Sequence, residues 1–303
     1  MRLPKAIAVV GPTACGKTKL GVDLAKKFNG EIVSADSRQI YRHLDLCTGK
    51  DKEDYLIGKK KIPYHLIDIL EPDREFSSAD FQKEAFKTIN KIIKRGKLPI
   101  LVGGSPFYVY SVTEGWSFPK LDHDPKIRDR VRKMSLEEKQ QALEKIDPAA
   151  YEKIDRNNPR RLERALEICL VSGKKFEDFK PKASPKFDFL FLGKIHSLDT
   201  IKERVKKRLE ERFEAGMIEE VAGVLKRKKA SAKDLEKMGL EPRFITYYLE
   251  GRINKQELED LLLKNIISFA KRQITWFGKD QRINWIEDSS KEPENLVRDF
   301  IKK

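Results

Sequence analysis

Residues 11–18, Gly-Pro-Thr-Ala-Cys-Gly-Lys-Thr, are the stretch of this chain best suited to chemistry. They fit the spacing G-x-x-x-x-G-K-[ST], in which backbone N–H groups surround phosphate oxygens. A short apolar run precedes them at 6–10, and residues 19–28 carry apolar side chains at helical spacing. A strand, this loop and a helix together turn N–H groups toward an anion. We therefore expect Lys17 to reach a terminal phosphate and Thr18 to offer its hydroxyl to Mg²⁺.

A second candidate site follows residues 31–36, Glu-Ile-Val-Ser-Ala-Asp, which predict a short strand ending in an acid. Asp36 would then lie near the phosphate loop, at the mouth of a sheet. Its carboxylate could hold magnesium or act as a general base, and the plainer alternative is an aspartate that caps a turn. Arg38 and Gln39 beside it are suited to hydrogen-bond a base edge or a phosphate.

A third candidate site follows the apolar run 98–102, which predicts another strand. Gly103 and Gly104 come directly after it and permit close backbone approach to a ligand. Ser105 could orient a phosphate or a reacting group. A plain strand-to-helix turn explains the same residues equally well.

Arginines recur at helical spacing further along the chain. Residues 157–167 predict a helix with Pro159 in its first turn, and Arg160 and Arg164 fall on one face of it. Phosphate or RNA contact is one interpretation of this face. A solvated, charged helix face is the other.

Two further segments combine cations with helical or aromatic patterns. Arg204, Arg208 and Arg212 are four residues apart within 199–229, which predict a basic amphipathic helix or helix pair. One of these arginines could complete an anion site. Residues 271–277, Lys-Arg-Gln-Ile-Thr-Trp-Phe, are compatible with RNA stacking and equally with core packing of the two aromatic side chains.

The composition favours an anionic macromolecule as partner. Lys plus Arg number 63 against 48 Asp plus Glu, a net charge of +15, which is the electrostatic pattern of a nucleic-acid binder. Charged residues make up 37% of the chain, above the usual share of about 25%, so a surface charged for stability is the alternative. No apolar run approaches about 18 residues, and we expect neither a membrane span nor a signal peptide. The three cysteines lack metal-ligand spacing, so a cytoplasmic protein is expected.

These residues must be positioned by an α/β fold. Strands and helices alternate over 1–115, which predicts a P-loop parallel sheet core flanked by helices, with ligands at the carboxyl ends of the strands. Residues 116–185 change to short, charged helical stretches divided by prolines. We therefore predict a smaller all-helical insertion domain over 116–185, after which 186–303 return to the core.

Taken together, the segments resemble the tRNA dimethylallyltransferase (isopentenyltransferase) family. The resemblance spans nearly the whole chain in the right order. The residues that carry it are 11–18, 34–42 (Ser-Ala-Asp-Ser-Arg-Gln-Ile-Tyr-Arg), 64–72, 101–105, 158–167, 204–221 and 271–277.

The resemblance implies transfer of the dimethylallyl group from dimethylallyl pyrophosphate to N6 of the adenine 3′ of the anticodon, after that base is turned out of its stack. It implies Asp36 and Ser105 as the catalytic residues. It implies a pyrophosphate site, with Mg²⁺ at Thr18, built from Gly11, Thr13, Ala14, Cys15, Gly16, Lys17, Thr18 and Arg208. The expected contacts of the tRNA anticodon arm are Asp36, Ser37, Arg38, Gln39, Arg128, Arg160, Arg161, Leu162, Glu163, Arg164, Arg272 and Gln273. A monomer is expected.

The chain departs from the family pattern at four places. Ser105-Pro106 replaces the usual Thr and small residue, and Arg212 stands where the family usually has Met. Residues 239–246 lack the expected Gly-Tyr-Lys/Arg-Glu pattern, and Gly278 stands where Arg is common. The alternatives to tRNA modification are an adenylate isopentenyltransferase, a P-loop small-molecule or nucleotide kinase, and a non-catalytic RNA-binding module.

Overall fold

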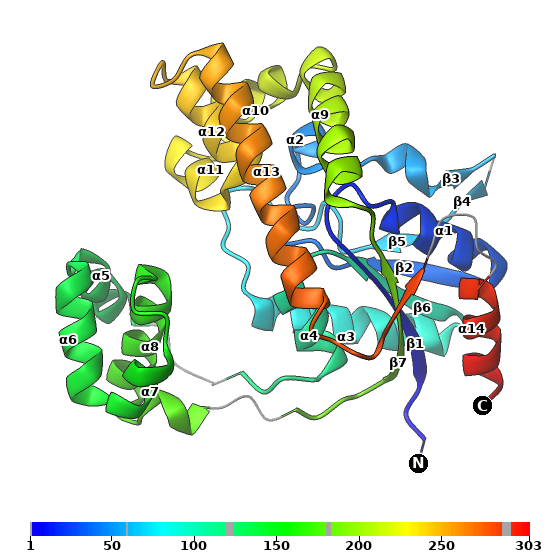
Figure 1. Ribbon diagram of the computed structural model, residues 1–303, viewed down its shortest axis with the longest axis horizontal. Helices are drawn as coiled ribbons and strands as arrows, with labels where there is room; N and C mark the ends of the chain where they lie inside the picture. The colour runs from blue at the N-terminus through cyan, green and yellow to red at the C-terminus, as the bar shows by residue number, and fades with distance from the viewer. Residues whose placement is uncertain (1, 59, 119–123, 180–182, 287–291) are drawn as a thin grey trace. The chain divides into compact units, whose positions relative to one another are not determined.

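The computed structural model describes residues 2–58, 60–118, 124–179, 183–286 and 292–303. It divides the chain into two compact units (Figure 1). Unit 1 comprises Met1–Gly115 and Pro185–Lys303, and unit 2 comprises Trp116–Ser184. Every helix among the described residues is too short or too polar to cross a lipid bilayer.

Unit 1 is built on a six-stranded sheet in the order β5-β2-β6-β1-β7-β8, in which every neighbouring pair is parallel. The predicted parallel α/β core is therefore confirmed. The chain passes from β1 to β2 and later inserts β6 between them, so β1 lies centrally in the sheet. The strands are β1 (Lys5–Val10), β2 (Gly30–Ser34), β5 (Tyr64–His65), β6 (Leu98–Gly103), β7 (Asp188–Lys194) and β8 (Ile283–Ile286).

Helices cover both faces of this sheet, which explains why its central strands are continuously buried. On one face, α1 (Lys17–Lys27) and α14 (Glu292–Lys302) share an apolar cluster with β1, β2 and β6. The connection through α1 leads from β1 toward the β5 edge of the sheet, and the connection through α3 (Ser78–Lys94) leads back from β5 to β6. Because both connections are right-handed and run in opposite directions, α3 lies on the other face of the sheet. There α4 (Pro106–Thr113) packs against α3, and Tyr108 stacks on Phe81 with ring centroids 4.0 Å apart.

A helical layer follows β7 in the chain (Figure 1). Apolar side chains of its helices form a separate cluster. The predicted helix over 199–229 is a pair, because the first helix ends at Glu214 and Gly216, at φ 92°, caps the start of the second. The helices of the layer are α9 (Leu198–Glu214), α10 (Met217–Lys226), α11 (Ala232–Met238), α12 (Leu240–Leu249) and α13 (Lys255–Phe277). Short elements complete unit 1: α2 (Asp45–Thr48), a 3-10 turn η1 (Lys52–Tyr55), β3 (Leu56–Ile57) and β4 (Lys60–Lys61).

Unit 2 is helical and has a small core of its own. Three of its helices have proline in the first turn, directly after an Asp or Asn N-cap. Both residue types favour the start of a helix, so the prolines in the sequence mark where these helices begin. Its elements are α5 (Pro125–Lys133), α6 (Leu136–Ile146), α7 (Pro148–Lys153), α8 (Pro159–Ser172) and η2 (Phe176–Phe179).

A buried carboxylate ties β2 to β5 and to the end of α3. Glu31 is 6% exposed, and its Oε2 accepts hydrogen bonds from Arg95, at 2.6 Å, and from His65 Nε2, at 2.7 Å. Burial raises the pKa of Glu31, but the hydrogen bonds and charges of Arg95 and His65 outweigh it and lower the pKa below the ordinary 4.5. This group therefore stabilises the fold above about pH 4.5 and loses that contribution as the pH falls further.

We predict that Arg95→Met lowers the free energy of unfolding at neutral pH by about 1–2 kcal/mol, because the buried carboxylate loses its charged donor. The difference from wild type should shrink as the pH falls below about 4.5, because the carboxylate becomes protonated in both proteins. Denaturant unfolding at neutral and acidic pH measures this, with the exposed Lys94→Met as the control. A difference that does not change with pH would show that Arg95 acts only by packing.

Candidate active site

The carboxyl ends of β1, β2 and β6 lie side by side, so the three candidate segments of the sequence meet at one edge of the sheet. They line one pocket, which is open to solvent. Residues from α9 and α12 complete the walls. The pocket carries four cationic side chains, Lys17, Arg38, Arg208 and Arg212, and three carboxylates, Asp36, Asp51 and Glu241.

The loop between β1 and α1 has the backbone geometry of an anion-binding loop. Gly11 has φ 151°, and a Cβ there would lie 2.2 Å from the carbonyl oxygen of Lys194. Gly16, at φ 83°, begins α1, whose first turn contains no acid. Lys17 Nζ donates to Pro12 O at 3.0 Å, and Cys15 is fully buried. The loop N–H groups, the start of α1 and Lys17 therefore make one positive region.

Arg208 adds a second, partly buried cation to this region. It extends from α9, and its Nη2 donates to Thr13 Oγ1 at 2.7 Å. Burial, together with the nearby charge of Arg212, lowers the pKa of Arg208 to about 10. Among the described residues, neither Lys17 nor Arg208 has a carboxylate within ion-pair distance. Two cations that have no ion-paired carboxylate at a phosphate-type loop indicate a site for an anion.

Gln273 was expected to contact tRNA, but the structure gives it a different position. Its side chain is buried, its Oε1 accepts from Thr13 N at 2.8 Å, and its Nε2 donates to Gly104 O at 2.6 Å. Both ends of the amide are therefore used to hold the β1 loop to the β6 loop. The same helix presents Arg272 at the surface, where it donates to Ser268 Oγ at 2.7 Å. Of the aromatic pair, Trp276 is 39% exposed and Phe277 is fully buried.

Asp36 is half-buried in the pocket, and one of its oxygens caps a turn. Oδ1 accepts from Arg38 N at 2.9 Å and from Gln39 N at 3.4 Å. The turn-capping alternative is thus observed for Oδ1, and it fixes the orientation of the carboxylate. Among the described residues Oδ2 has no hydrogen-bond partner, so it is available to a substrate.

Ser105 joins the second and third candidate segments. Its Oγ accepts from Ser37 N at 3.1 Å and donates to Ser37 Oγ at 3.3 Å. Pro106, a departure from the family pattern, is the first residue of α4. A proline there costs no helical hydrogen bond, because the first N–H groups of a helix have no partner within the helix.

Arg38 forms a buried ion pair that sequence analysis missed. Its Nη1 contacts Glu241 Oε2, and both side chains are nearly inaccessible to solvent. Burial lowers the pKa of Arg38, but the carboxylates of Glu241 and Asp36 outweigh it and raise the pKa. Glu241 lies more than two hundred residues further along the chain, in the segment that lacks the family pattern, so no local signal pointed to it. The pair fixes Arg38 at one wall of the pocket.

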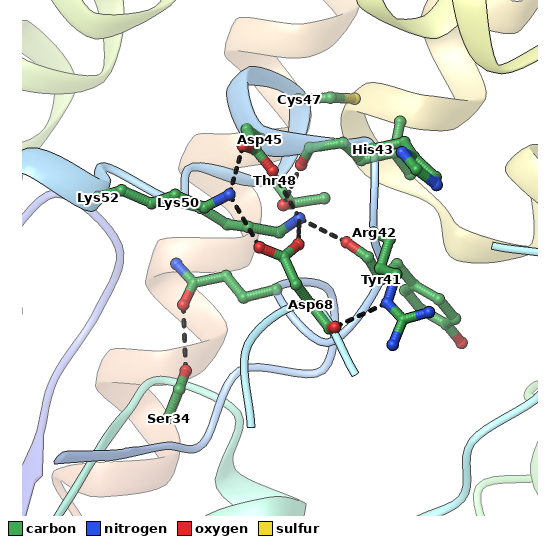
Figure 2. A network of polar contacts seen from close by, with 12 residues as sticks. Ser34, Tyr41, Arg42, His43, Asp45, Cys47, Thr48, Lys50, Lys52 and Asp68 are labelled. Atoms are coloured by element: carbon green, nitrogen blue, oxygen red, sulfur yellow. Dashed lines mark hydrogen bonds and ion pairs between the residues drawn. The ribbon is translucent and has the colours of Figure 1, made fainter. Parts of the chain in front are cut away.

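Another segment that lines the pocket, residues 48–51, is held by a network around a buried lysine. Lys50, whose side chain is inaccessible, contacts Asp45 Oδ1 at 2.9 Å and Asp68 Oδ1 at 2.6 Å, and it also donates to Tyr41 O. Lys52 pairs with the second oxygens of the same two carboxylates. Figure 2 shows both lysines converging on Asp68. The network keeps Thr48, Gly49 and Asp51 in place at the pocket.

The remaining predicted tRNA contacts lie on unit 2. Arg160, Arg161 and Arg164 are exposed on α8, although Arg164 also lies 3.3 Å from Glu167. Leu162 is fully buried in the core of the unit and offers no side chain to a partner, because residues 161 and 162 point to different sides of the helix. Glu163 pairs with Lys139 at 3.1 Å, and Arg128 Nε lies 3.4 Å from Glu167.

Known proteins resemble this chain over nearly its full length. A family model described as IPP transferase matches residues 39–280. The tRNA dimethylallyltransferase 2 of Shewanella sediminis is 42% identical over 287 residues, which cover 93% of each chain. The tRNA dimethylallyltransferase of Carboxydothermus hydrogenoformans is 38% identical over 304 residues, covering 98% of this chain and 96% of the relative.

Solved structures agree with these matches. The tRNA isopentenylpyrophosphate transferase of Bacillus halodurans superposes with a TM-score of 0.70 at 32% identity, covering 98% of this chain and 95% of that one. A eukaryotic dimethylallyltransferase acting on tRNA superposes with a TM-score of 0.83 at 25% identity, covering 99% of this chain and 80% of that one. The resemblance found in the sequence is therefore confirmed, and the chain belongs to the tRNA dimethylallyltransferase family.

Proposed function

We propose that this enzyme transfers the dimethylallyl group from dimethylallyl pyrophosphate to N6 of the adenine 3′ of the anticodon in tRNA. The observation that carries the proposal is the pocket itself. Among the described residues, Lys17 and Arg208 form no ion pair with a carboxylate, and Asp36 lines the same pocket with one oxygen that has no hydrogen-bond partner. A pyrophosphate group and an amine that must lose a proton match these two features.

The reaction forms a bond between adenine N6 and C1 of the dimethylallyl group, and it breaks the bond between C1 and the pyrophosphate oxygen. Pyrophosphate leaves with the bonding electron pair, and the surplus N6 proton passes to Asp36 Oδ2. Negative charge grows on the leaving oxygens as the bond breaks. In this proposal the loop N–H groups, Lys17 and Arg208 stabilise that charge. Groups that are held in position before the reaction stabilise a developing charge efficiently, because they need not rearrange. Ser105, whose Oγ contacts Ser37 next to Asp36, assists the transfer in this proposal.

An oxygen ligand for Mg²⁺ is also present in the pocket. The Thr18 hydroxyl lines it. No group of three or more metal-binding side chains occurs among the described residues, but Mg²⁺ at phosphate sites commonly takes only one or two protein ligands and completes its shell with phosphate and water. Thr18 therefore fits the ion, which would neutralise pyrophosphate charge when bound.

The exposed arginines of α8 and Arg272 supply charge for the tRNA backbone in this proposal. A net charge of +15 supports a polyanionic partner. A monomer in the cytoplasm remains our prediction.

Mass analysis of nucleosides after incubation with tRNA and dimethylallyl pyrophosphate tests the function. We expect one adenosine per anticodon arm to gain a dimethylallyl group in place of a hydrogen, with release of pyrophosphate. Free adenylate and ATP with small acceptors are assayed in parallel. Modification of adenylate in place of tRNA would establish the adenylate isopentenyltransferase instead, and phosphate transfer from ATP would establish a kinase.

Asp36→Asn is predicted to lower single-turnover transfer by about 10²–10⁴, the usual contribution of a general base. The amide oxygen can still accept from the N–H groups of Arg38 and Gln39, so the turn and the affinity for tRNA should be kept. Asp23→Asn, an exposed position of α1, is the matched control. Transfer by the Asp36 variant near the wild-type rate would remove Asp36 from the proton-transfer step.

The triple variant Arg160→Ala, Arg161→Ala and Arg164→Ala should flatten the salt dependence of tRNA binding. We expect the slope of log affinity against log salt to fall by about one unit for each lost phosphate contact. Lys83→Ala, Lys87→Ala and Lys91→Ala on α3 remove the same charge from another exposed face and serve as the control. Equal slopes for wild type and the arginine variant would make this face an ordinary solvated one.

A further inference from the structure

Arg212 is a buried guanidinium in the pocket, at a position where the family pattern led us to expect methionine. It lies on α9 one turn beyond Arg208, and its side chain is only 8% exposed. Its Nη2 donates to both carboxylate oxygens of Asp51, at 3.0 and 3.3 Å. A single nitrogen makes both contacts. Among the described residues, Nη1 and Nε have no hydrogen-bond partner.

Gly49 is the residue that makes room for this guanidinium. A Cβ at Gly49 would lie 2.6 Å from Arg212 Nη2 and 3.0 Å from Nη1. Gly49 also has φ +69°, a conformation that other residues adopt at a cost. Its carbonyl oxygen accepts from Gln39 Nε2 at 2.8 Å, and the lysine network next to it fixes the segment (Figure 2). The glycine and the arginine therefore fit each other in a rigid wall.

The charges of this wall are not balanced. Arg212 lies close enough to Arg208 for its charge to contribute, after burial, to the lowered pKa of Arg208. Lys17, Arg208 and Arg212 line the pocket together, and Asp51 is the only carboxylate that pairs with any of these three cations among the described residues. Asp51 is itself half-exposed, so it neutralises Arg212 incompletely. An anion bound between Arg208 and Arg212 would offset the repulsion between their positive charges.

We propose that Arg212 is a second pyrophosphate-binding guanidinium, which reaches the donor across Gly49 and binds its pyrophosphate together with Arg208. The inference rests on the proposed function for the identity of the donor. Its free nitrogens can bind an additional phosphate oxygen, because a guanidinium has five donors in a fixed fork. The site should therefore distinguish pyrophosphate from a single phosphate more strongly than a site with Arg208 alone.

Calorimetric binding of inorganic pyrophosphate, with inorganic phosphate for comparison, tests this without tRNA. Arg212→Met should weaken pyrophosphate binding about tenfold and phosphate binding much less. Arg212→Lys should lie between, because it keeps the charge and loses the fork. Lys206→Met, exposed on the same helix, removes the same charge and should bind as wild type does.

Asp51→Asn separates a ligand role from a structural ion pair. If Arg212 binds the anion, removing the competing carboxylate should leave pyrophosphate affinity unchanged or raise it several-fold, opposite in sign to Arg212→Met. If the pair only supports the fold, both variants should weaken binding alike and lower the unfolding temperature alike. Unchanged affinity in Arg212→Met, or parallel losses in the two variants, would overturn the proposal.

Gly49→Ala adds an independent test, because the new Cβ displaces the guanidinium. Its loss of pyrophosphate affinity should match that of Arg212→Met, and the double variant should be no weaker than either single variant. Additive losses would contradict the proposal.

Failure of the proposed function would appear separately, as wild-type protein that binds no pyrophosphate or does not modify tRNA. Failure of this inference alone would leave wild-type binding and transfer intact.

Discussion

Positive charge held without full compensation at the carboxyl edge of a parallel sheet is the constraint on which the site depends. Burying a cation is costly unless a counter-charge accompanies it. Lys17 and Arg208 are partly buried and form no ion pair with a carboxylate among the described residues, whereas the neighbouring Arg38 is paired with Glu241. This contrast distinguishes Arg38, whose charge is used within the fold, from Lys17 and Arg208, whose charges are available to an anion. It also explains why the pKa of Arg208 is lowered whereas that of Arg38 is raised.

Holding such charges in place requires rigid loops, and the polar contacts around the pocket supply that rigidity. Gln273 connects the β1 loop to the β6 loop, and Ser105 connects the β6 loop to the β2 loop. Buried Lys50 then fixes the segment after β2 through Asp45 and Asp68. Each of these contacts joins different elements, so the three loops are held relative to one another before any ligand binds. A preorganised set of donors stabilises developing charge without having to rearrange.

Sequence analysis located the parts of this site that local patterns encode. Spacing within single elements was enough to predict the phosphate loop, Asp36 after β2 and Arg208 on α9. The structure brings these three parts into one pocket. What it missed depends on partners distant in the chain. Glu241 reaches Arg38 from α12, and Gln273 is buried although Arg272 next to it is exposed. Strand β8, only four residues long, also lacked a clear pattern.

The pairing of Gly49 with Arg212 shows how a departure from a family pattern can be read physically. Taken alone, an arginine in place of methionine only adds charge to an already basic chain. In the structure it is buried, and the residue facing it is a glycine at positive φ that a Cβ would bring into collision with the guanidinium. An arginine tolerated by accident would extend to solvent, since its side chain is long enough to place its charge in water. This one points into the wall of the pocket, where only a residue without a side chain leaves it room. The space beside Gly49 and the positive φ of that residue both leave room for the Arg212 guanidinium. The Nη1 and Nε donors of this guanidinium, which have no hydrogen-bond partner among the described residues, are then available to an anion in the pocket.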